Sequence, residues 1–447
     1  MARLHAHDAV RRASPSDAWH QRRRAGAGPG PGHRAARFAR RLPVRPRLEH
    51  PALRTPRGAA GGLPVSIPAP TSGPRALATL TDRQIFDYLC LRQPATRTDI
   101  ADSLGLSKPT ASQGILRLQE NGLVSSVAAD YDPKAAVRRG RAPESYGINQ
   151  DFGHLLGLSL EAGTLLGRTT DLSGRTLADA HLAVPTEASA AAVQQLAADM
   201  VQELIAASAG QTLAAGVSQS SPVQRAGEQS TALPTPVYAG SSASVAPLVR
   251  EQTGAPTSLD NDVNWMAQAQ IALDAGRAAG SFVLLYVGPG IGTALVIDSK
   301  VHRGASGTAG ELSAQRFAEH TFLERLRAAG LTEAGSSRVD CARLLRALSG
   351  KEPDDHLVAG LTELLADVLG NLLAFFDPHR LVLCGPLAPF ESFTIGLQSA
   401  LARRMGLGRT EFEVSTLGED AALRGALHGA RSKHLVRLWS SYRAEAV

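Results

Sequence analysis

The segment SKPTASQGILRLQENG, residues 107–122, constrains the fold most, because it carries both the start and the stop signals of one short helix. Ser107 can cap the first turn, and Pro109 falls where its missing N–H costs little. Ile115 and Leu118 lie about one turn apart and point inward. The closing Asn-Gly pair is a typical C-terminal stop. The segment therefore predicts a helix with an apolar rear face and a polar N-terminal end.

Two further helices are predicted before this segment. TDRQIFDYL predicts a helix that begins at Thr81, with Gln84 completing a capping box. TRTDIADSLG predicts a second, shorter helix, with Thr98 as its cap and Gly105 at its end. After the third helix, LVSSVAADYD alternates weakly, as a hairpin strand does. The order of helix, short helix, tight turn, helix and hairpin predicts a winged helix-turn-helix over residues 76–147.

The third helix of such a module lies in the DNA major groove, and the wing can reach the minor groove. Its polar side chains, and the arginines of the segment VRRGRAPE, suit phosphates and base edges. A solvated helix face and a charged loop are the alternative interpretation. The ordered set of cap, turn, polar face and basic wing favours double-stranded DNA as the partner. The predicted contact residues are Lys108, Thr110, Ser112, Gln113, Arg117, Arg138, Arg139 and Arg141.

The net charge of +6 belongs to the N-terminal segment, not to the body of the protein. Residues 1–75 hold fifteen Arg, no Lys, three acidic residues and eleven of the 26 prolines, so the remaining chain carries a charge of −6. Repeated proline blocks helix and removes backbone donors, which predicts a disordered extension. It is either a basic arm on nucleic acid or a flexible extension, and the scattered positions of its arginines favour the second.

Residues 148–447 read as a mixed α/β region. HLLGLSLEAGTLLGRTTDLSG predicts two strands around a turn, and SFVLLYVGPGIGTALVIDSKVHRG predicts strand, Gly loop, strand, turn and strand. HLVAGLTELLADVLGNLLAFFDP predicts a long helix with one apolar stripe, and RLVLCGPLA a buried strand. Hairpins combined with strand–helix units predict a two-lobed α/β domain with a cleft.

Several classes of protein are disfavoured by composition. No run of eighteen apolar residues occurs and the N-terminus lacks a continuous apolar region, so neither a membrane span nor a signal peptide is predicted. The cysteines Cys90, Cys341 and Cys384 are odd in number and widely spaced, which argues against a disulfide framework and against a Cys-rich zinc site. A reducing, cytoplasmic compartment is expected.

The motifs, taken in order, resemble the ROK family of repressors, open reading frames and sugar kinases. GLSKPTASQGILRLQENGLV resembles the family's DNA-binding helix and turn, and RRGRAPESYGIN its wing. LDNDVNWMAQAQ resembles the helix start that carries the catalytic Asp of the kinases, and VGPGIGTALVIDSKVHRGASGTAGELS the second phosphate loop and the Gly-Glu element of the sugar site. The resemblance covers residues 76–435 and implies a winged helix-turn-helix followed by an actin-like, sugar-kinase-like domain of two lobes.

The sequence departs from the family's kinases at the opening phosphate loop. Where these kinases carry an Asp and paired glycines, this chain reads GLSLEAGT, with Ser159 at the Asp position and Glu161 at a Gly position. A carboxylate there repels a triphosphate. Pro289 removes a backbone donor from the second loop, whose glycines then serve only to turn a hairpin. Phosphoryl transfer depends on charge neutralisation, so no enzymatic activity and no cofactor are predicted.

The sugar-contacting positions are retained in part. The resemblance implies that Asn261, Asp262 and Glu311 contact an effector, since carboxylates and amides can each pair with two hydroxyls. The family's zinc motif is absent, because QRFAEHTFLERLR contains no Cys, so no metal is predicted and His320 is expected at the surface. Asn261-Asp262 can equally serve as a helix cap. Both roles remain open.

Together these features predict a DNA-binding transcriptional regulator of the ROK type, most consistent with a repressor. It would respond to a sugar or sugar phosphate and act as a homodimer or higher oligomer, because one short helix reads few base pairs. Two alternatives stay open. One is a sugar kinase that carries a DNA-binding module, and the other is a regulator whose large domain binds no ligand and serves only for dimerisation.

Overall fold

The structure is a computed structural model that describes residues 74–127 and 144–442, apart from residues 162, 186, 227–228, 234–238, 276, 278–279 and 406–409. The wing arginines Arg138, Arg139 and Arg141 lie outside the described residues, as does the predicted extension up to residue 73.

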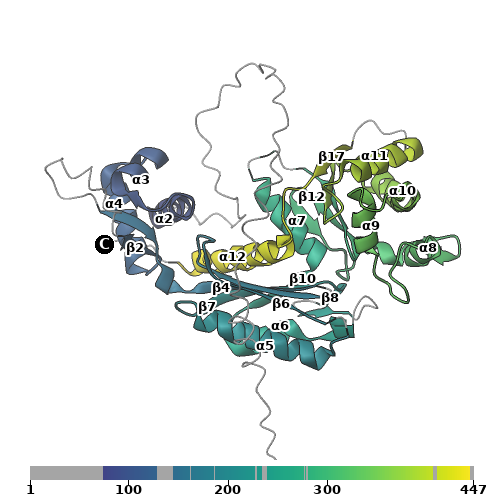
Figure 1. The fold of residues 1–447 in the computed structure, drawn as a ribbon. Coiled ribbons are helices and arrows are strands. Elements are labelled where there is room, and N and C mark those ends of the chain that lie inside the picture. Colours follow the sequence, from purple (N-terminus) through teal and green to yellow (C-terminus); the bar gives the residue numbers. More distant parts are fainter. Residues whose placement is uncertain are drawn as a thin grey trace, which may run out of the picture. The chain divides into compact units, whose positions relative to one another are not determined.

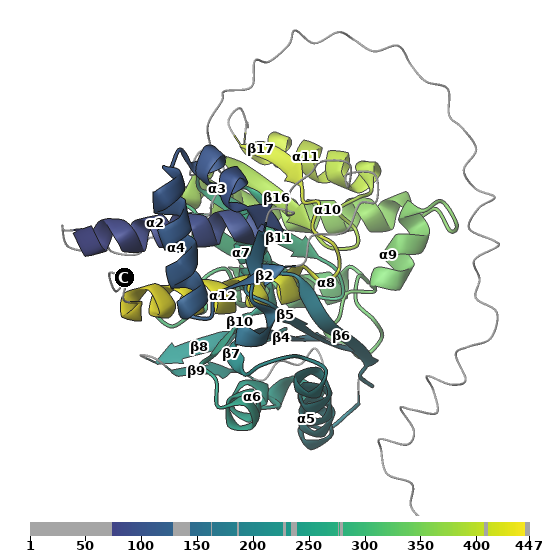
Figure 2. The same cartoon turned by 90° about the vertical axis from the view of Figure 1, so that its left-hand side faces the viewer.

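The N-terminal module consists of three helices and a small antiparallel sheet (Figures 1 and 2). The helices are α2 (Pro74–Leu91), α3 (Arg97–Leu104) and α4 (Lys108–Glu120). The strands are β1 (Ala95–Thr96), β2 (Val124–Val127) and β3 (Ser145–Ile148), in the order β1-β3-β2. Ile85, Phe86 and Leu89 of α2 are fully buried, as their helical spacing predicted.

The first helix begins earlier than predicted. Thr81 does not cap α2, because the helix already starts at Pro74 and the Thr81 hydroxyl donates to the carbonyl of Leu77, 3.0 Å away. The preceding segment ALATL is rich in strong helix formers, which let the helix continue upstream of the expected cap.

Of the capping residues predicted for the next two helices, one is wrong and one is confirmed. Thr96, not Thr98, caps α3, in a reciprocal capping box with Asp99. Ser107 caps α4 as predicted, accepting from the amide of Thr110 at 3.2 Å. Gly105 between the two helices has φ +65°, so the left-handed conformation that closes α3 suits glycine.

The first large sheet has the strand order β10-β7-β4-β5-β6. Helices α5 and α6 cover one face of this sheet, and α12 lies on the other (Figure 1). Strands β4, β5 and β6 form an antiparallel meander, while β7 and β10 add in parallel. The bounds are β4 (His154–Glu161), β5 (Thr164–Thr170), β6 (Thr176–Ala183), β7 (Thr212–Gln219), β10 (Thr257–Asn261), α5 (Ala190–Ala206), α6 (Val245–Thr253) and α12 (Ala421–Ser441).

The second large sheet repeats this topology in the order β13-β12-β11-β16-β17. Three sequential antiparallel strands are again followed by two parallel ones, which gives the two-lobed α/β arrangement that the sequence predicted. The strands are β11 (Phe282–Val287), β12 (Ile291–Ile297), β13 (Lys300–His302), β16 (Arg380–Cys384) and β17 (Glu411–Val414). The helices of this lobe are α7 (Asp262–Leu273), α8 (Phe322–Ala328), α9 (Cys341–Leu348), α10 (Asp355–Phe376) and α11 (Glu391–Met405).

The smaller elements lie in the connections. Two short hairpins pair β8 with β9 and β14 with β15. Their bounds are β8 (Val223–Ala226), β9 (Gln229–Ala232), β14 (Arg316–Phe317) and β15 (His320–Thr321). Single 3-10 turns occur at Gln150–Phe152, Ala239–Ser242 and Leu312–Ala314.

Helix α10 is long and apolar enough to cross a membrane by length and composition. Its stripe of Leu361, Leu365 and Val368 is instead fully buried in the core of the second lobe, against α8, α9 and α11. This burial accounts for its composition.

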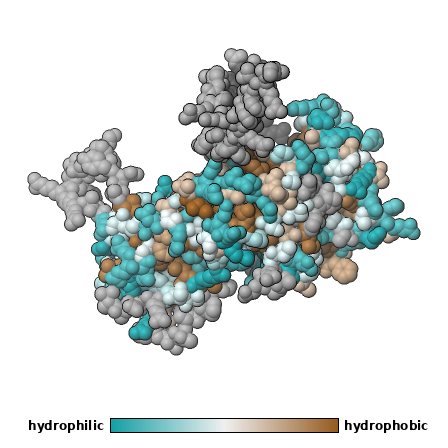
Figure 3. Space-filling model, turned by 90° about the horizontal axis from the view of Figure 1, so that it is seen from below, coloured by the Kyte–Doolittle hydropathy of each residue, from teal (hydrophilic) through white to brown (hydrophobic). Residues whose placement is uncertain are grey.

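On the face that carries α5 and α6, exposed apolar residues are interspersed with hydrophilic ones (Figure 3).

The helices α7 and α12 approach each other more closely than side chains normally allow. A Cβ atom at Gly425 of α12 would lie 1.8 Å from the carbonyl oxygen of Trp265 of α7, and one at Gly429 would lie 2.3 Å from the Trp265 ring. The indole of Trp265 donates to the carbonyl of Val217 on β7 at 2.9 Å. Glycine at these two helix positions therefore joins α12 to the start of α7.

We expect Gly425→Ala to destabilise the protein by about 1–3 kcal/mol or more, because the added methyl group must displace the α7 backbone. The measurement is the free energy of unfolding in urea. Gly360→Ala in α10 is the matched control, since a Cβ there meets nothing within 4 Å. The control should be neutral or stabilising by up to about 1 kcal/mol. Equal stabilities of the two variants would contradict the close α7–α12 contact.

Candidate DNA-binding face and effector cleft

The N-terminal end of α4 presents a polar face. Lys108 and Gln113 are exposed, whereas Thr110 and Ser112 are half-buried. The hydroxyl of Thr110 lies 2.7 Å from that of Ser107, so the capping residue orients it. Four of the five predicted helix residues thus have accessible side chains at one end of α4.

The fifth residue, Arg117, does not belong to this face, and the expectation that it reaches a DNA phosphate does not hold in the structure. Only 8% of Arg117 is exposed. Its guanidinium donates to both carboxylate oxygens of the fully buried Asp82, at 2.8 and 2.6 Å. Tyr442, which follows α12, donates to the same carboxylate at 3.0 Å. These three residues, the anchor network, connect α4, α2 and the end of α12.

The inward position of Asp82 has a signal in the sequence that the motifs did not reveal. Asp82 precedes Ile85 by three residues and Phe86 by four, so it occupies the inward stripe of α2. A carboxylate at a core position requires a buried partner. The sequence could have indicated such a pair, but only the fold identifies Arg117 and Tyr442 as the partners.

A second site lies between the two lobes of the large domain. Strand β10 ends directly at the start of α7, and the side chain of Asn261 caps this helix by accepting from the amide of Val263 at 2.9 Å. Asn261 also donates to the carbonyl of Ser221 at 3.1 Å. The adjoining cavity, the effector cleft, has a volume of about 290 Å³ and is lined by Asn261, Asp262 and Glu311. The three predicted effector-contacting residues therefore line one cavity.

Asp262 is almost completely buried and heavily hydrogen-bonded. Its carboxylate accepts from the Ser220 hydroxyl at 2.5 Å and from the amide of Val263 at 2.8 Å. Burial raises the pKa of Asp262, and these hydrogen bonds oppose the rise. The capping role of Asn261 and the cleft position of Asp262 coexist, so the two interpretations of this pair are compatible.

Two further carboxylates face the same cavity. Glu161 comes from the end of β4 and accepts from the buried Ser159 hydroxyl at 3.2 Å. Burial and the nearby Asp262 raise the pKa of Glu161 to about 7. Burial and Asp262 likewise raise the pKa of Glu311 to about 7. The cleft is therefore acidic, yet it holds at least part of this charge in protonated form at neutral pH.

The Gly-rich segment 288–290 forms the turn of the β11–β12 hairpin. The amide of Gly288 donates to the carbonyl of Gly290 at 2.9 Å, and the carbonyl of Pro289 accepts from the amide of Val339 at 2.9 Å. Gly292 packs against Val263 at the start of α7. Within the described residues no group of three or more His, Cys, Asp or Glu side chains is arranged to hold a metal ion.

Sequence reasoning missed an ionic cluster around the buried Asp260, which directly precedes the capping residue Asn261. Asp260, 1% exposed, accepts from Arg225 at 3.0 Å and from Arg303 at 2.5 Å. These arginines come from β8 and from the loop after β13, so the cluster ties both segments to β10. Gly310 adopts φ +91° against the carbonyl of Thr293, which sets the position of Glu311.

Comparison with known proteins decides the family. The model of the ROK family matches residues 162–321, and that of a winged helix-turn-helix DNA-binding domain matches residues 79–125. An N-acetyl-D-glucosamine kinase of Histophilus somni is 30% identical over 207 residues, which span 39% of this chain and 67% of the kinase. The chain belongs to the ROK family. The predicted fold class, a winged helix-turn-helix followed by a two-lobed sugar-kinase-like ROK domain, is confirmed.

Other relatives of this ROK protein include a transcriptional regulator of Mycobacterium tuberculosis, 28% identical over 326 residues, which cover 67% of this chain and 73% of the relative. The crystal structure of a ROK family transcriptional regulator, a homologue of the E. coli MLC protein, superposes with a TM-score of 0.54. It has 16% sequence identity and covers 81% of this chain and 98% of the other. This structural likeness extends the shared fold over both domains.

We expect Glu161→Gln to raise the melting temperature at pH 8 and to have little effect near pH 4. The folded protein holds the Glu161 proton up to a pKa of about 7, whereas the unfolded chain releases it near the ordinary value of 4.5. Stability therefore decreases as the pH rises from 4.5 to 7, and the amide removes this decrease. Each kcal/mol regained corresponds to about 2–4 °C, measured by calorimetry.

Glu203→Gln, on the exposed face of α5, is the matched control for this change of charge. It should leave the difference between the melting temperatures at pH 8 and pH 4 unchanged. A Glu161→Gln protein with the pH profile of the wild type would show that the cleft does not raise the pKa of Glu161.

Proposed function

We propose that this ROK protein is a DNA-binding transcriptional regulator, a repressor, whose large domain binds a sugar or sugar-derived effector without phosphorylating it. The observation that carries the proposal is the anchor network, because it joins the polar recognition helix α4 directly to the last helix of the domain that holds the effector cleft. A cytoplasmic location and a homodimer or higher oligomer are part of the proposal, since one short helix reads few base pairs.

The proposed operator contacts are the accessible residues of α4, Lys108, Thr110, Ser112 and Gln113, together with the wing arginines Arg138, Arg139 and Arg141. The exposed Gln113 amide can pair with an adenine edge, and Lys108 at the helix start can reach a phosphate. The match to a winged helix-turn-helix and the regulator names of several relatives support this assignment.

The proposed effector contacts are Asn261, Asp262 and Glu311 in the effector cleft. Protonated or hydrogen-bonded carboxyl groups and an amide can each pair with hydroxyls of a sugar. Glu161 beside Asp262 disfavours a triphosphate in the same cavity, because the negative charge of the phosphate chain would face an acidic wall. This charge, together with Ser159 at the position of the family's metal-organising Asp, supports binding without phosphoryl transfer.

The coupling between the two sites follows a continuous path of packed elements. Asp262 starts α7, and Trp265 of α7 packs against the two glycines of α12. Helix α12 then leads to Tyr442, which contacts Asp82 and through it Arg117 of α4. An effector that prefers one position of α7 would change the free energy of the arrangement that presents α4 to DNA.

Binding to an operator obtained by selection from random duplexes tests the DNA-binding assignment. We expect Gln113→Ala to reduce discrimination at one or two base pairs by about 1–3 kcal/mol, because alanine cannot form the bidentate hydrogen bonds to a base edge. Replacing Arg138, Arg139 and Arg141 together with Ala should weaken binding to every duplex. It should also lower the salt slope by about 0.9 for each phosphate that is no longer neutralised. Fluorescence anisotropy against salt concentration measures both effects.

Gln119→Ala, near the other end of α4, is the matched control for Gln113→Ala and should keep the sequence preference of the wild type. An unchanged preference in Gln113→Ala would remove this residue from the interface. A wild-type protein that prefers no duplex over random DNA would overturn the proposed function itself.

A thermal-shift screen with unmodified and phosphorylated sugars tests the effector assignment. A ligand that binds only the folded state stabilises it by about 2.7 kcal/mol at a hundredfold excess over Kd. We expect such a shift for at least one sugar and its disappearance in Asp262→Asn. Asp298→Asn, in the exposed β12–β13 turn, is the control and should respond as the wild type.

The same sugars should produce no release of ADP from ATP. Turnover that Asp262→Asn abolishes would instead identify a kinase. A protein that binds its operator but is stabilised by no sugar would leave the large domain with a role in dimerisation alone.

A further inference from the structure

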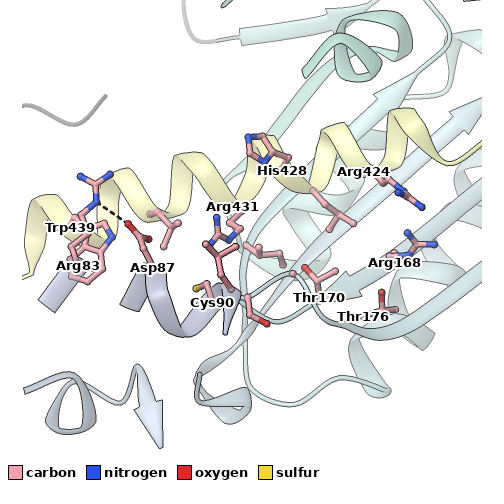
Figure 4. Close-up of a pocket in the computed structure, with 16 residues that line it drawn as sticks. Arg83, Asp87, Cys90, Arg168, Thr170, Thr176, Arg424, His428, Arg431 and Trp439 are labelled. Carbon is pink, nitrogen blue, oxygen red and sulfur yellow. Dashed lines mark ion pairs between the residues drawn. The ribbon is translucent and has the colours of Figure 1, made fainter. Parts of the chain in front are cut away.

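A second and larger cavity lies between the DNA-binding module and the ROK domain. It has a volume of about 480 Å³, and we refer to it as the joint cavity. Helix α2 contributes Arg83 and Asp87, α12 contributes Arg431 and Trp439, and the start of β6 contributes Thr176 (Figure 4). This volume lies within the range of small-molecule sites. The cavity shares no lining residue with the effector cleft.

Arg431 brings a guanidinium group to this cavity, close to the Asp87 carboxylate and the Cys90 thiol. Its Nε atom donates to the carbonyl of Leu172 at 2.6 Å, which fixes the guanidinium group. Among the described residues no carboxylate forms an ion pair with Arg431. Figure 4 shows Arg431 extending from α12 towards Cys90 of α2. Two terminal nitrogens of a guanidinium are suited to bidentate recognition of an anion.

Trp439 supplies an independent sign that an acceptor is missing. This side chain is only 6% exposed, and its Nε1 atom is buried without a hydrogen-bond partner among the residues that the structure describes. A buried donor without an acceptor costs about 1–3 kcal/mol, so such groups are rare in folded proteins. Trp439 lines the joint cavity at the end where Arg83 and Asp87 form an ion pair (Figure 4).

The opposite end of the cavity is also rich in donors. Arg168 and Arg424 lie side by side there, and both pair with Asp420, while Arg168 also pairs with Asp179. Arg424 uses only Nε in its pair with Asp420, and its side chain is 56% exposed. These two carboxylates hold the arginines in place and offset part of their charge. The donors that remain available are terminal guanidinium nitrogens.

The floor of the joint cavity is apolar. This leucine floor consists of Leu155 of β4 and Leu427 and Leu435 of α12. Thr170 and Ser173 add hydroxyl groups. Burial lowers the pKa of the neighbouring His428 to about 4, so this residue stays neutral and adds no charge at physiological pH. A cavity lined by both leucines and donor groups suits a small organic molecule that carries acceptors, rather than a bare ion.

We propose that the joint cavity binds a small phosphorylated metabolite, with its phosphate against Arg431 and its carbon skeleton over the leucine floor. Because α2 and α12 both form the wall, the bound molecule stabilises one arrangement of the DNA-binding module on the ROK domain. If that arrangement differs in its affinity for the operator, the bound molecule changes operator affinity by the same factor by which the operator changes the affinity for the molecule. This effect on operator affinity rests on the proposed function. The binding site itself does not depend on that function.

Isothermal titration of the full chain tests the proposal, with inorganic phosphate, glucose 6-phosphate and glucose as probes at constant ionic strength. We expect both phosphates to bind, and glucose 6-phosphate to bind more tightly than inorganic phosphate. Arg431→Gln should weaken both by at least about tenfold, because the charge-assisted hydrogen bonds to the phosphate are removed. Arg431→Lys should retain part of the affinity.

A second pair of variants keeps the test independent of the packing of Arg431. Thr176 is exposed at the rim, so Thr176→Glu and Thr176→Lys are both compatible with folding. The glutamate should weaken binding of glucose 6-phosphate several-fold and the lysine should not, since only the glutamate adds negative charge to the wall. Asp262→Asn should leave binding of phosphate unchanged.

Three results would overturn the proposal. The first is a wild-type protein that binds neither inorganic phosphate nor glucose 6-phosphate. The second is a loss of affinity for glucose 6-phosphate in Asp262→Asn, which would assign binding to the effector cleft. The third is binding of glucose 6-phosphate by both Arg431→Gln and Thr176→Glu with the affinity of the wild type. Binding of phosphate by a protein without any sequence preference on DNA would support the joint cavity and overturn only the proposed function.

Discussion

The attachment of the recognition helix to the ROK domain depends on the buried ion pair between Arg117 and Asp82. Taking both charges out of water is costly, and the bidentate geometry together with the Tyr442 hydroxyl offsets that cost. The pair fixes α4 on α2, and Tyr442 ties both to the end of α12. Without it, the recognition helix would be attached to the ROK domain mainly by apolar contacts, which specify position less strictly.

The same helix, α12, contacts both α7, which begins at the effector cleft, and α2 of the DNA-binding module. Its first half packs through Gly425 on α7, where Asp262 faces the effector cleft. Its second half carries Arg431 and Trp439, which line the joint cavity against α2. The joint cavity, which is rich in donors, lies along α12, and the acidic effector cleft lies at the start of α7, on which α12 packs. A displacement of α12 would change its contacts with α7 beside the effector cleft, with the joint cavity and with the DNA-binding module.

Much of the fold was predictable because its signals are local. Ser107 caps α4, Gly105 closes α3, and the apolar stripe of α10 marks a core helix, all as expected from spacing and residue type. The predictions that failed were also local. Thr81 does not cap because strong helix formers extend α2 upstream of it, and Asp99 makes Thr96 a better cap than Thr98. Helix boundaries depend on such small differences in free energy.

The sequence by itself determined the order of the elements, the winged helix-turn-helix and the two-lobed class, because these follow from periodicity and from motifs in chain order. Its resemblance to the ROK family also pointed to Asn261, Asp262 and Glu311, three residues that line the effector cleft. Only the tertiary structure decided that Arg117 is buried, that Asp260 draws Arg225 and Arg303 together, and that Arg431 and Trp439 share a cavity with α2. These contacts join residues distant along the chain, and the pairing of such residues depends on packing, which no local pattern records.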